Sequence, residues 1–269
     1  MGKSRLYSMV IFALMSFSMA AYAFAEATLE APEFKVGQWV SYNMTMDLKD
    51  GTKQTLEATY SIVGEEQCEG QDCLWHEVAF NVSKEQRTVY RVLLPTIKEV
   101  SAETMLCYLS LVANIGDAKR YVLWVPGSQP TEADMGVLKS VNDDLVKKGQ
   151  RKGFAQEEPI KSLDEMKLEQ KPVVVKTDGK EFSCEYYAAT LKSELSEHRQ
   201  WKYEVWHSNM IPVFGFARLK REKLLFGKSE QMELVIKDFG FSGATSVVPG
   251  EPVKADMRAG KGPIGPKPK

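Results

Sequence analysis

The stretch WKYEVWHSNMIPVFGF, residues 201–216, carries the pattern that decides the predicted fold. Apolar and aromatic side chains occupy every second position of its first seven residues, which is the period of a β-strand with one covered face. Asn209 and Pro212 interrupt the run, because asparagine tolerates turn geometry and proline has no N–H for a ladder. The run resumes at Val213, and Gly215 indicates a bulge or a close backbone approach. The stretch therefore predicts two strands joined by a turn, with an aromatic face that other strands must cover.

Four runs nearer the N-terminus carry the same alternation of apolar and polar residues. Short turns such as Asp50-Gly51 separate them, and successive alternating runs with short connections are typical of an antiparallel meander with one covered face. Further strands are expected after the middle of the chain. The predicted strands cover residues 36–48, 56–62, 74–82, 88–94, 120–125, 173–176, 182–188 and 231–239.

The segment near 101–170 differs and predicts a helical insertion. Residues 101–115 form an apolar run that begins at Ser101, a good N-cap, and ends before a glycine. Thr131 opens a capping-box-like sequence ahead of an apolar stripe that ends at Gly149. A further short helix is expected to open at residues 162–165. These patterns together favour an α+β protein that is mainly β, with one domain over residues 26–243.

The N-terminus predicts export. Two cations precede an apolar run at residues 9–21, and Ala23-Phe24-Ala25 fits the small-x-small rule for signal-peptidase cleavage. We expect residues 1–25 to be a signal peptide and the mature chain to be periplasmic or secreted, with no transmembrane anchor after cleavage near Ala25. Removal of Lys3 and Arg5 with no acid moves the net charge from −1 to −3, which gives no electrostatic basis for nucleic-acid binding.

The C-terminal residues 244–269 are rich in Pro, Gly and Lys and hold few bulky apolar residues. Such a segment cannot bury enough apolar surface to order itself, so a flexible tail is predicted.

The four cysteines all lie in the mature chain, where an oxidising compartment permits disulfides. Cys68 and Cys73 flank a turn-like stretch and are the predicted bridge. Cys107 and Cys184 form either a long-range bridge or two buried thiols.

The residue patterns of common catalytic and metal sites are missing. The three histidines have no metal-ligand spacing, and no G-x-S-x-G elbow occurs. The one G-x-G-x-x-G match, residues 260–265, lies in the tail and follows no strand. We therefore expect a protein that is not an enzyme, with no catalytic residues, no metal and no cofactor.

Three motifs resemble a known superfamily. They are V-G-x-W-V-x-Y at residues 36–42, F-x-C-x-Y at 182–186, and V-W-x-S-x-x-x-P-x-x-G at 205–215. The pattern is similar to uncharacterised bacterial periplasmic proteins of the lipoprotein-carrier-like superfamily, which includes LolA and LolB. The resemblance implies a strongly curved antiparallel sheet, a half-barrel, with helices covering a concave apolar face that can hold acyl chains. It brings no catalytic set.

Ten apolar and aromatic residues are predicted to converge on that face as a ligand-binding wall, because methionines and aromatics make adaptable pockets. The second interpretation is that they are filled core. The residues are Tyr42, Met44, Met46, Leu56, Tyr60, Ile62, Phe80, Tyr90, Trp201 and Tyr203.

A basic run at residues 218–228 is interpreted as a solvated strand face, with contact to an anionic head group as the second interpretation. The favoured function is an exported soluble protein that binds an acyl chain, lipid or lipoprotein. The alternative is a non-enzymatic module of the cell envelope that has a solid core and binds other envelope proteins.

Overall fold

The structure, a computed structural model, describes residues 33–47, 51–83, 86–96, 118–140, 160–168, 172–177, 179–193, 199–225 and 228–255. The predicted signal peptide, the predicted helix at 101–115, Cys107 and residues 256–269 lie outside these ranges.

One curled sheet contains most of the described strands. Its order is β13-β6-β5-β4-β3-β2-β1-β12-β11-β10-β9-β7, and β8 pairs with β9 off this path. The described neighbours are antiparallel except β13 and β6, which are parallel. The strands are β1 (Trp39–Asp47), β2 (Lys53–Cys68), β3 (Gln71–Asn81), β4 (Arg87–Pro95), β5 (Arg120–Trp124), β6 (Thr131–Glu132), β7 (Ile160–Leu168), β8 (Val173–Thr177), β9 (Lys180–Ser193), β10 (Arg199–His207), β11 (Phe216–Leu225), β12 (Lys228–Gly240) and β13 (Val253–Lys254).

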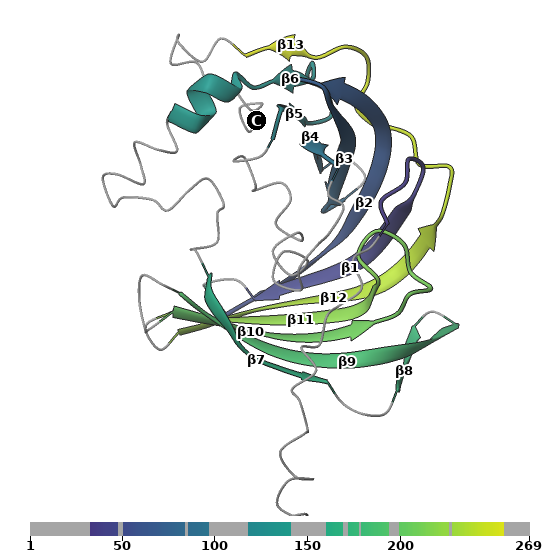
Figure 1. Ribbon diagram of the computed structural model, residues 1–269, viewed down its shortest axis with the longest axis vertical. Coiled ribbons are helices and arrows are strands. Elements are labelled where there is room, and N and C mark those ends of the chain that lie inside the picture. The colour runs from purple at the N-terminus through teal and green to yellow at the C-terminus, as the bar shows by residue number, and fades with distance from the viewer. Residues whose placement is uncertain are drawn as a thin grey trace, which may run out of the picture.

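The sheet bends into an open, C-shaped half-barrel with β13 and β7 towards its two ends (Figure 1). Register shifts occur in four strand pairs, among them shifts at Ser41/Tyr42, Ile62/Gly64 and Trp206/His207. Such β-bulges increase local twist and let a strand turn a corner. The predicted curved antiparallel sheet and the meander of β1 to β4 are therefore confirmed.

Predicted helices over the concave face are not supported by the described residues. The one helix among them covers only residues 135–140, where Asp134 caps it by accepting a hydrogen bond from the backbone N–H of Val137 (3.1 Å). Thr131–Glu132 forms β6, and residues 162–165 belong to β7. The capping-like sequence at residues 131–134 does precede the short helix, whereas the one at residues 162–165 was misleading because serine and aspartate also suit strand ends and turns.

The aromatic stretch at residues 201–216 forms β10, a loop and the first residue of β11. The second strand begins at Phe216 and not at Val213, whose φ of +69° places it in the left-handed region. The backbone N–H of Ser208 donates to the carbonyl of Gly215 (2.7 Å), which closes the loop. A Cβ added at Gly215 would lie 2.3 Å from His207 Nε2, so the predicted close approach at this glycine is confirmed.

Residues 244–255, predicted as part of a flexible tail, follow the outer face of β3 to β6. The Val248 side chain is buried in a cluster with Trp75 and Leu93. Glu77 accepts hydrogen bonds from the hydroxyl of Ser246 (2.6 Å) and from the N–H of Val247 (3.0 Å). A few apolar and polar anchors thus order a segment whose composition alone suggested flexibility.

Candidate functional site on the concave face

All ten predicted ligand-binding residues are described, and their strand registers bring them to the concave side of the sheet. Pairs such as Tyr42 with Ala58, Met44 with Leu56 and Ala58 with Phe80 lie directly across from one another. Seven of the ten are buried, while Met46, Phe80 and Tyr90 are half-buried. The convergence follows from the period-two alternation, but burial this deep makes most of these residues core.

One end of the concave face is sealed by the loop after β10. Ile211, Val213 and Phe214 of this loop are buried in the main apolar cluster. The Phe214 ring meets the Tyr60 ring edge-on, with centroids 4.9 Å apart, and stacks on Phe216 at 6.0 Å. Aromatic pairs in these arrangements add to the stability gained by burial. The loop therefore closes the end of the concave face nearest the β10–β11 connection.

Burial decreases along β1 and β12 toward the opposite end. The inward side chains of Tyr42, Leu219 and Leu234 are 0% exposed, and one row further along Met232 is 7% exposed. The last described inward residue of β1, Met46, is half-buried, whereas Tyr203 and Trp201 on β10 stay buried. The apolar face is thus a filled core at one end and is partly accessible at the other, where β1 turns to β2.

A cross-sheet row at the accessible end combines methionines with a cation. Met46 pairs with Met232, Met232 with Arg221, and Arg221 with Tyr203. Alternation along β11 places Arg221 on the same side as the buried Leu219. The positive charge of Arg221 acts across the concave face on Tyr60, where it opposes the rise in pKa that burial imposes on that phenol.

Two buried polar atoms on this face lack hydrogen-bond partners among the described residues. They are the Trp201 indole Nε1 and the Tyr42 hydroxyl. Their side chains are 3% and 0% exposed. Burial, with Tyr60 as a second cause, raises the pKa of Tyr42 well above its usual value, so the group stays protonated and can donate. Unsatisfied buried donors are uncommon, and both would accept an oxygen atom as a partner.

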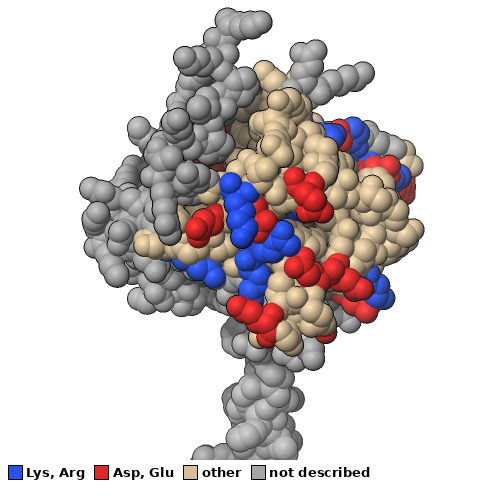
Figure 2. All heavy atoms as spheres, turned by 90° about the horizontal axis from the view of Figure 1, so that it is seen from above, with Lys and Arg blue, Asp and Glu red and all other residues tan. Residues whose placement is uncertain are grey.

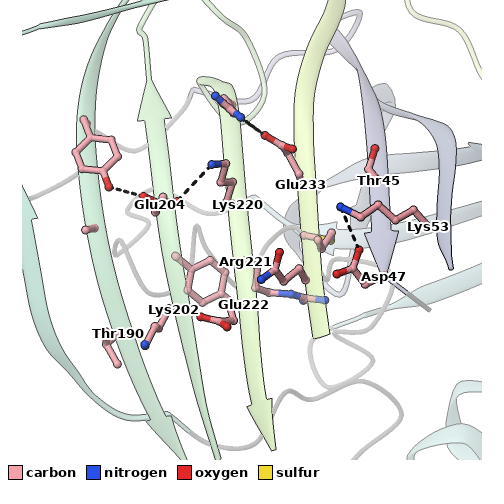
Figure 3. Close-up of a pocket in the computed structure, with 16 residues that line it drawn as sticks. Thr45, Asp47, Lys53, Thr190, Lys202, Glu204, Lys220, Arg221, Glu222 and Glu233 are labelled. Atoms are coloured by element: carbon pink, nitrogen blue, oxygen red, sulfur yellow. Dashed lines mark hydrogen bonds and ion pairs between the residues drawn. The ribbon is translucent and has the colours of Figure 1, made fainter. Parts of the chain in front are cut away.

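The outer side of the same strands carries a polar groove of about 620 Å³ (Figure 3). The strands themselves form the floor of the groove. Its lining therefore also includes Tyr203, Arg221 and Met232, which belong to these strands. Its charges are mostly paired across strands. Glu204 accepts a hydrogen bond from the Tyr186 hydroxyl (2.8 Å) and lies 3.8 Å from Lys220, and Arg218 Nε donates to Glu233 (2.6 Å). Most of the charged side chains of this groove therefore have partners within it.

Charge is similarly mixed elsewhere on the surface. Figure 2 shows basic and acidic side chains next to one another on the face seen from above, with no broad patch of one sign. On the outer side of β5, Arg120 is held by two hydrogen bonds to Glu132 (2.8 and 2.9 Å) and lies over the Trp75 ring. Because Arg120 already has this bidentate carboxylate partner, it is not free to bind an external anion.

The described histidines and cysteines form no reactive constellation. His76 is buried beside Phe34, and burial lowers its pKa to about 4. Cys68, Cys73 and Cys184 are free thiols in this structure, with Cys68 and Cys73 in hydrogen-bond contact, and the Cys68–Cys73 bridge stays a prediction. No group of three or more His, Cys, Asp or Glu side chains within the described ranges could hold a metal ion. Nor does that part of the chain contain a helix long and apolar enough to cross a membrane.

Comparisons with known proteins give matches of structure only. No protein-family model matches the sequence, and no curated protein matches it. A DUF1329 family protein from Desulfovibrio piger is 9% identical, over 78% of this chain and 87% of that one, with a TM-score of 0.30. A LolA superfamily protein from Nitrosomonas europaea is 10% identical, over 79% of this chain and 89% of that one, with a TM-score of 0.24.

A chain of the Pseudomonas aeruginosa MucA/MucB complex is also similar, at 10% identity over 76% of this chain and 88% of the matched chain, with a TM-score of 0.17. A LolA superfamily protein, the group that the sequence motifs resemble, is thus among the structures to which this chain is similar. TM-scores below 0.5 support no inference about ligand or partner, so the function is argued from the concave face alone.

Proposed function

We propose that this protein is an exported, non-catalytic binding protein that holds an acyl chain against the accessible end of its concave face. The observation that supports this is the decrease in burial along the inward rows, from fully buried Leu234 to half-buried Met46. The acyl chain belongs to a free fatty acid, a lipid or a lipoprotein. The predicted signal peptide would bring the chain to the compartment where such ligands move between membranes.

Binding would be driven by removal of apolar surface from water. Each methylene buried contributes about 0.8 kcal/mol, so ten methylenes contribute roughly 8 kcal/mol before the cost of ordering the ligand is subtracted. Met44, Met46 and Met232 lie close together at the accessible end, and their unbranched thioether side chains adapt to chains of varied shape. No bond is made or broken in this function.

The test is native mass spectrometry on protein exported to a bacterial periplasm and purified without detergent. We expect a heterogeneous added mass that solvent extraction removes and that is identified as acyl lipid. A single unliganded mass, together with no uptake of a fluorescent fatty acid, would contradict the proposal and favour a solid-core module that binds other proteins.

Two neighbouring residues provide a matched pair of variants. Met46→Glu places a charge on the concave face, whereas Thr45→Glu places the same charge on the outer side of the same strand, where Thr45 contacts Thr55 (3.2 Å). Met46→Glu should abolish the added mass, and Thr45→Glu should leave it unchanged. Equal loss in both variants would show that the acyl chain does not depend on the concave face.

A further inference from the structure

We propose that residues 244–255 form a strap that fixes the curvature of strands β1 to β6, and that this strap thereby regulates the affinity of the concave site for acyl chains. The inference rests on the proposed function and adds a means of regulation to it. The strap follows β12, crosses the outer side of the sheet and ends in β13 beside β6 (Figure 1). It therefore joins two parts of the half-barrel that lie far apart in the sheet.

Both ends of the strap are fixed by backbone hydrogen bonds. At the near end, the N–H of Ala244 donates to the carbonyl of Gly37 (2.9 Å), just before β1. At the far end, the N–H of Val253 donates to the carbonyl of Pro130 (2.9 Å), just before β6. The two anchors are thus five strand spacings apart, because β1 and β6 have β2, β3, β4 and β5 between them.

The strap has little slack between these anchors. Neighbouring strands lie about 4.8 Å apart, so the spacings from β1 to β6 amount to about 24 Å along the middle of the sheet. The path is longer on the outer side, which is the convex side of the curve. The chain from Ala244 to Val253 spans at most about 30 Å when fully extended. Further curling of the sheet would lengthen the outer path, so the strap resists it.

One apolar side chain and one buried carboxylate hold the middle of the strap. Val248 is 6% exposed and packs in the apolar cluster on the outer side of the sheet. Glu77 is buried and accepts hydrogen bonds from the hydroxyl of Ser246 and the N–H of Val247. The Ser246 hydroxyl also accepts a hydrogen bond from Arg91 (3.3 Å). Because so few side chains hold it, a single substitution should release the strap and leave the sheet folded.

The strands under the strap carry part of the concave face on their other side. Glu77 of β3 and Arg91 of β4 contact the strap. Phe80, Tyr90 and Tyr121 lie on the concave side of β3, β4 and β5, since successive side chains of a strand alternate between its faces. They form a half-buried row, with ring centroids 6.1 and 6.2 Å apart. A change in curvature therefore moves this row relative to the methionines of β1 and β12.

Two adjacent valines give matched variants for the test. Val248→Asn places an amide in the buried cluster and should release the strap, whereas Val247→Asn places the same amide at a position that is 39% exposed. Affinity for dodecanoate is measured by displacement of a fluorescent fatty acid, at a temperature where circular dichroism shows each variant to be folded. We expect Val248→Asn to bind dodecanoate about 5- to 150-fold more weakly than wild type, the usual range for coupled sites. Val247→Asn should bind it like wild type.

A second measurement needs only the wild-type chain. Coupling is reciprocal, so an acyl chain that binds better when the strap is docked must itself stabilise the docked strap. Saturating dodecanoate should therefore slow hydrogen exchange at the amides of Val247 and Val253, whose N–H groups are bonded in the docked state. Amides of β8, which is not part of the strap or of the strands beneath it, are the reference.

The outcomes separate the two proposals. If wild-type protein takes up neither the fluorescent fatty acid nor dodecanoate, the acyl-binding function itself is wrong. If it binds both but Val248→Asn binds as tightly, or loses no more affinity than Val247→Asn, the function stands and regulation by the strap is overturned. Strap exchange that dodecanoate leaves unchanged also overturns it, and this result decides the question if Val248→Asn does not fold.

Discussion

The two sides of β10, β11 and β12 are built in opposite ways from alternating residues of the same strands. On the outer side, Glu204 with Lys220 and Arg218 with Glu233 form cross-strand pairs (Figure 3). On the concave side, apolar rows are fully buried at one end and half-buried at the other, where a single row includes Arg221. An outer side whose charges are mostly paired suits contact with water, whereas an apolar side that is partly accessible at one end suits contact with an apolar ligand.

The largest expected loss of stability is at one of two glycines that both have positive φ, Gly215 and Gly179. Gly215→Ala would place a methyl group 2.3 Å from the buried His207 ring, whereas nothing lies within 4 Å of a Cβ at Gly179. We expect Gly215→Ala to lower the free energy of unfolding by roughly 3 kcal/mol or more and Gly179→Ala by about 1 kcal/mol. Urea denaturation measures both. Equal losses would mean that the loop does not seal the concave face as described.

The next comparison uses adjacent residues on opposite sides of β11. Leu219 is fully buried in the main apolar cluster, while Lys220 is a half-exposed member of the outer groove. Leu219→Ala should cost about 2–5 kcal/mol of stability, because it removes packed methyl groups and leaves a cavity. Lys220→Ala should cost less than about 1 kcal/mol, the usual worth of an exposed ion pair. Thermal unfolding of the two variants gives the difference directly, and a reversal of the order would show that the sides are wrongly assigned.

A pH effect is expected from a buried histidine on the concave side. Burial lowers the pKa of His76 to about 4, below the value near 6.5 of an unfolded histidine. Between these values the unfolded chain binds a proton that the folded chain does not, so stability falls as the pH falls from 6.5 toward 4. The loss should be on the order of 2 kcal/mol at pH 4.5. His76→Phe should remove this part of the pH dependence, measured by urea unfolding at pH 7 and 4.5. An unchanged dependence would mean that His76 is accessible to protons when folded.

The smallest effect is expected on the outer side. Lys202 is exposed and stands across from Glu222 without a salt bridge among those described. Lys202→Met should alter stability by less than about 0.5 kcal/mol. A larger change in thermal unfolding would show that the groove contributes more to stability than its exposed ion pairs indicate.

Much of the sheet follows from the sequence because alternation is a local signal. The strands from Val40 to Leu94 and the inward ten residues could be assigned from period two alone, and Gly215 could be assigned from its place in an aromatic hairpin. The ends of elements were less predictable. Residues 162–165 resemble a helix start, yet β7 pairs with β9 there, because tertiary pairing outweighs a weak capping pattern.

Two features needed partners that the sequence does not place. The outer groove depends on Glu204 and Lys220 meeting across β10 and β11, which only the strand register decides. The ordered segment after β12 depends on Glu77, which lies about 170 residues earlier and accepts hydrogen bonds from residues 246 and 247. Composition shows that the segment is rich in Pro and Gly, but it cannot show that Val248 packs into a buried apolar cluster. Cys68 and Cys73 come together as expected, as thiols in this structure.

The most direct measurement of the central claim is photo-crosslinking with a diazirine-bearing dodecanoate, followed by mapping of the labelled residues. The acyl chain is predicted to label the accessible end of the concave face, at Met46 and Met232, with excess unlabelled dodecanoate suppressing the labelling. Labelling confined to outer residues such as Lys202 and Thr45, or labelling that unlabelled dodecanoate does not suppress, would contradict the account.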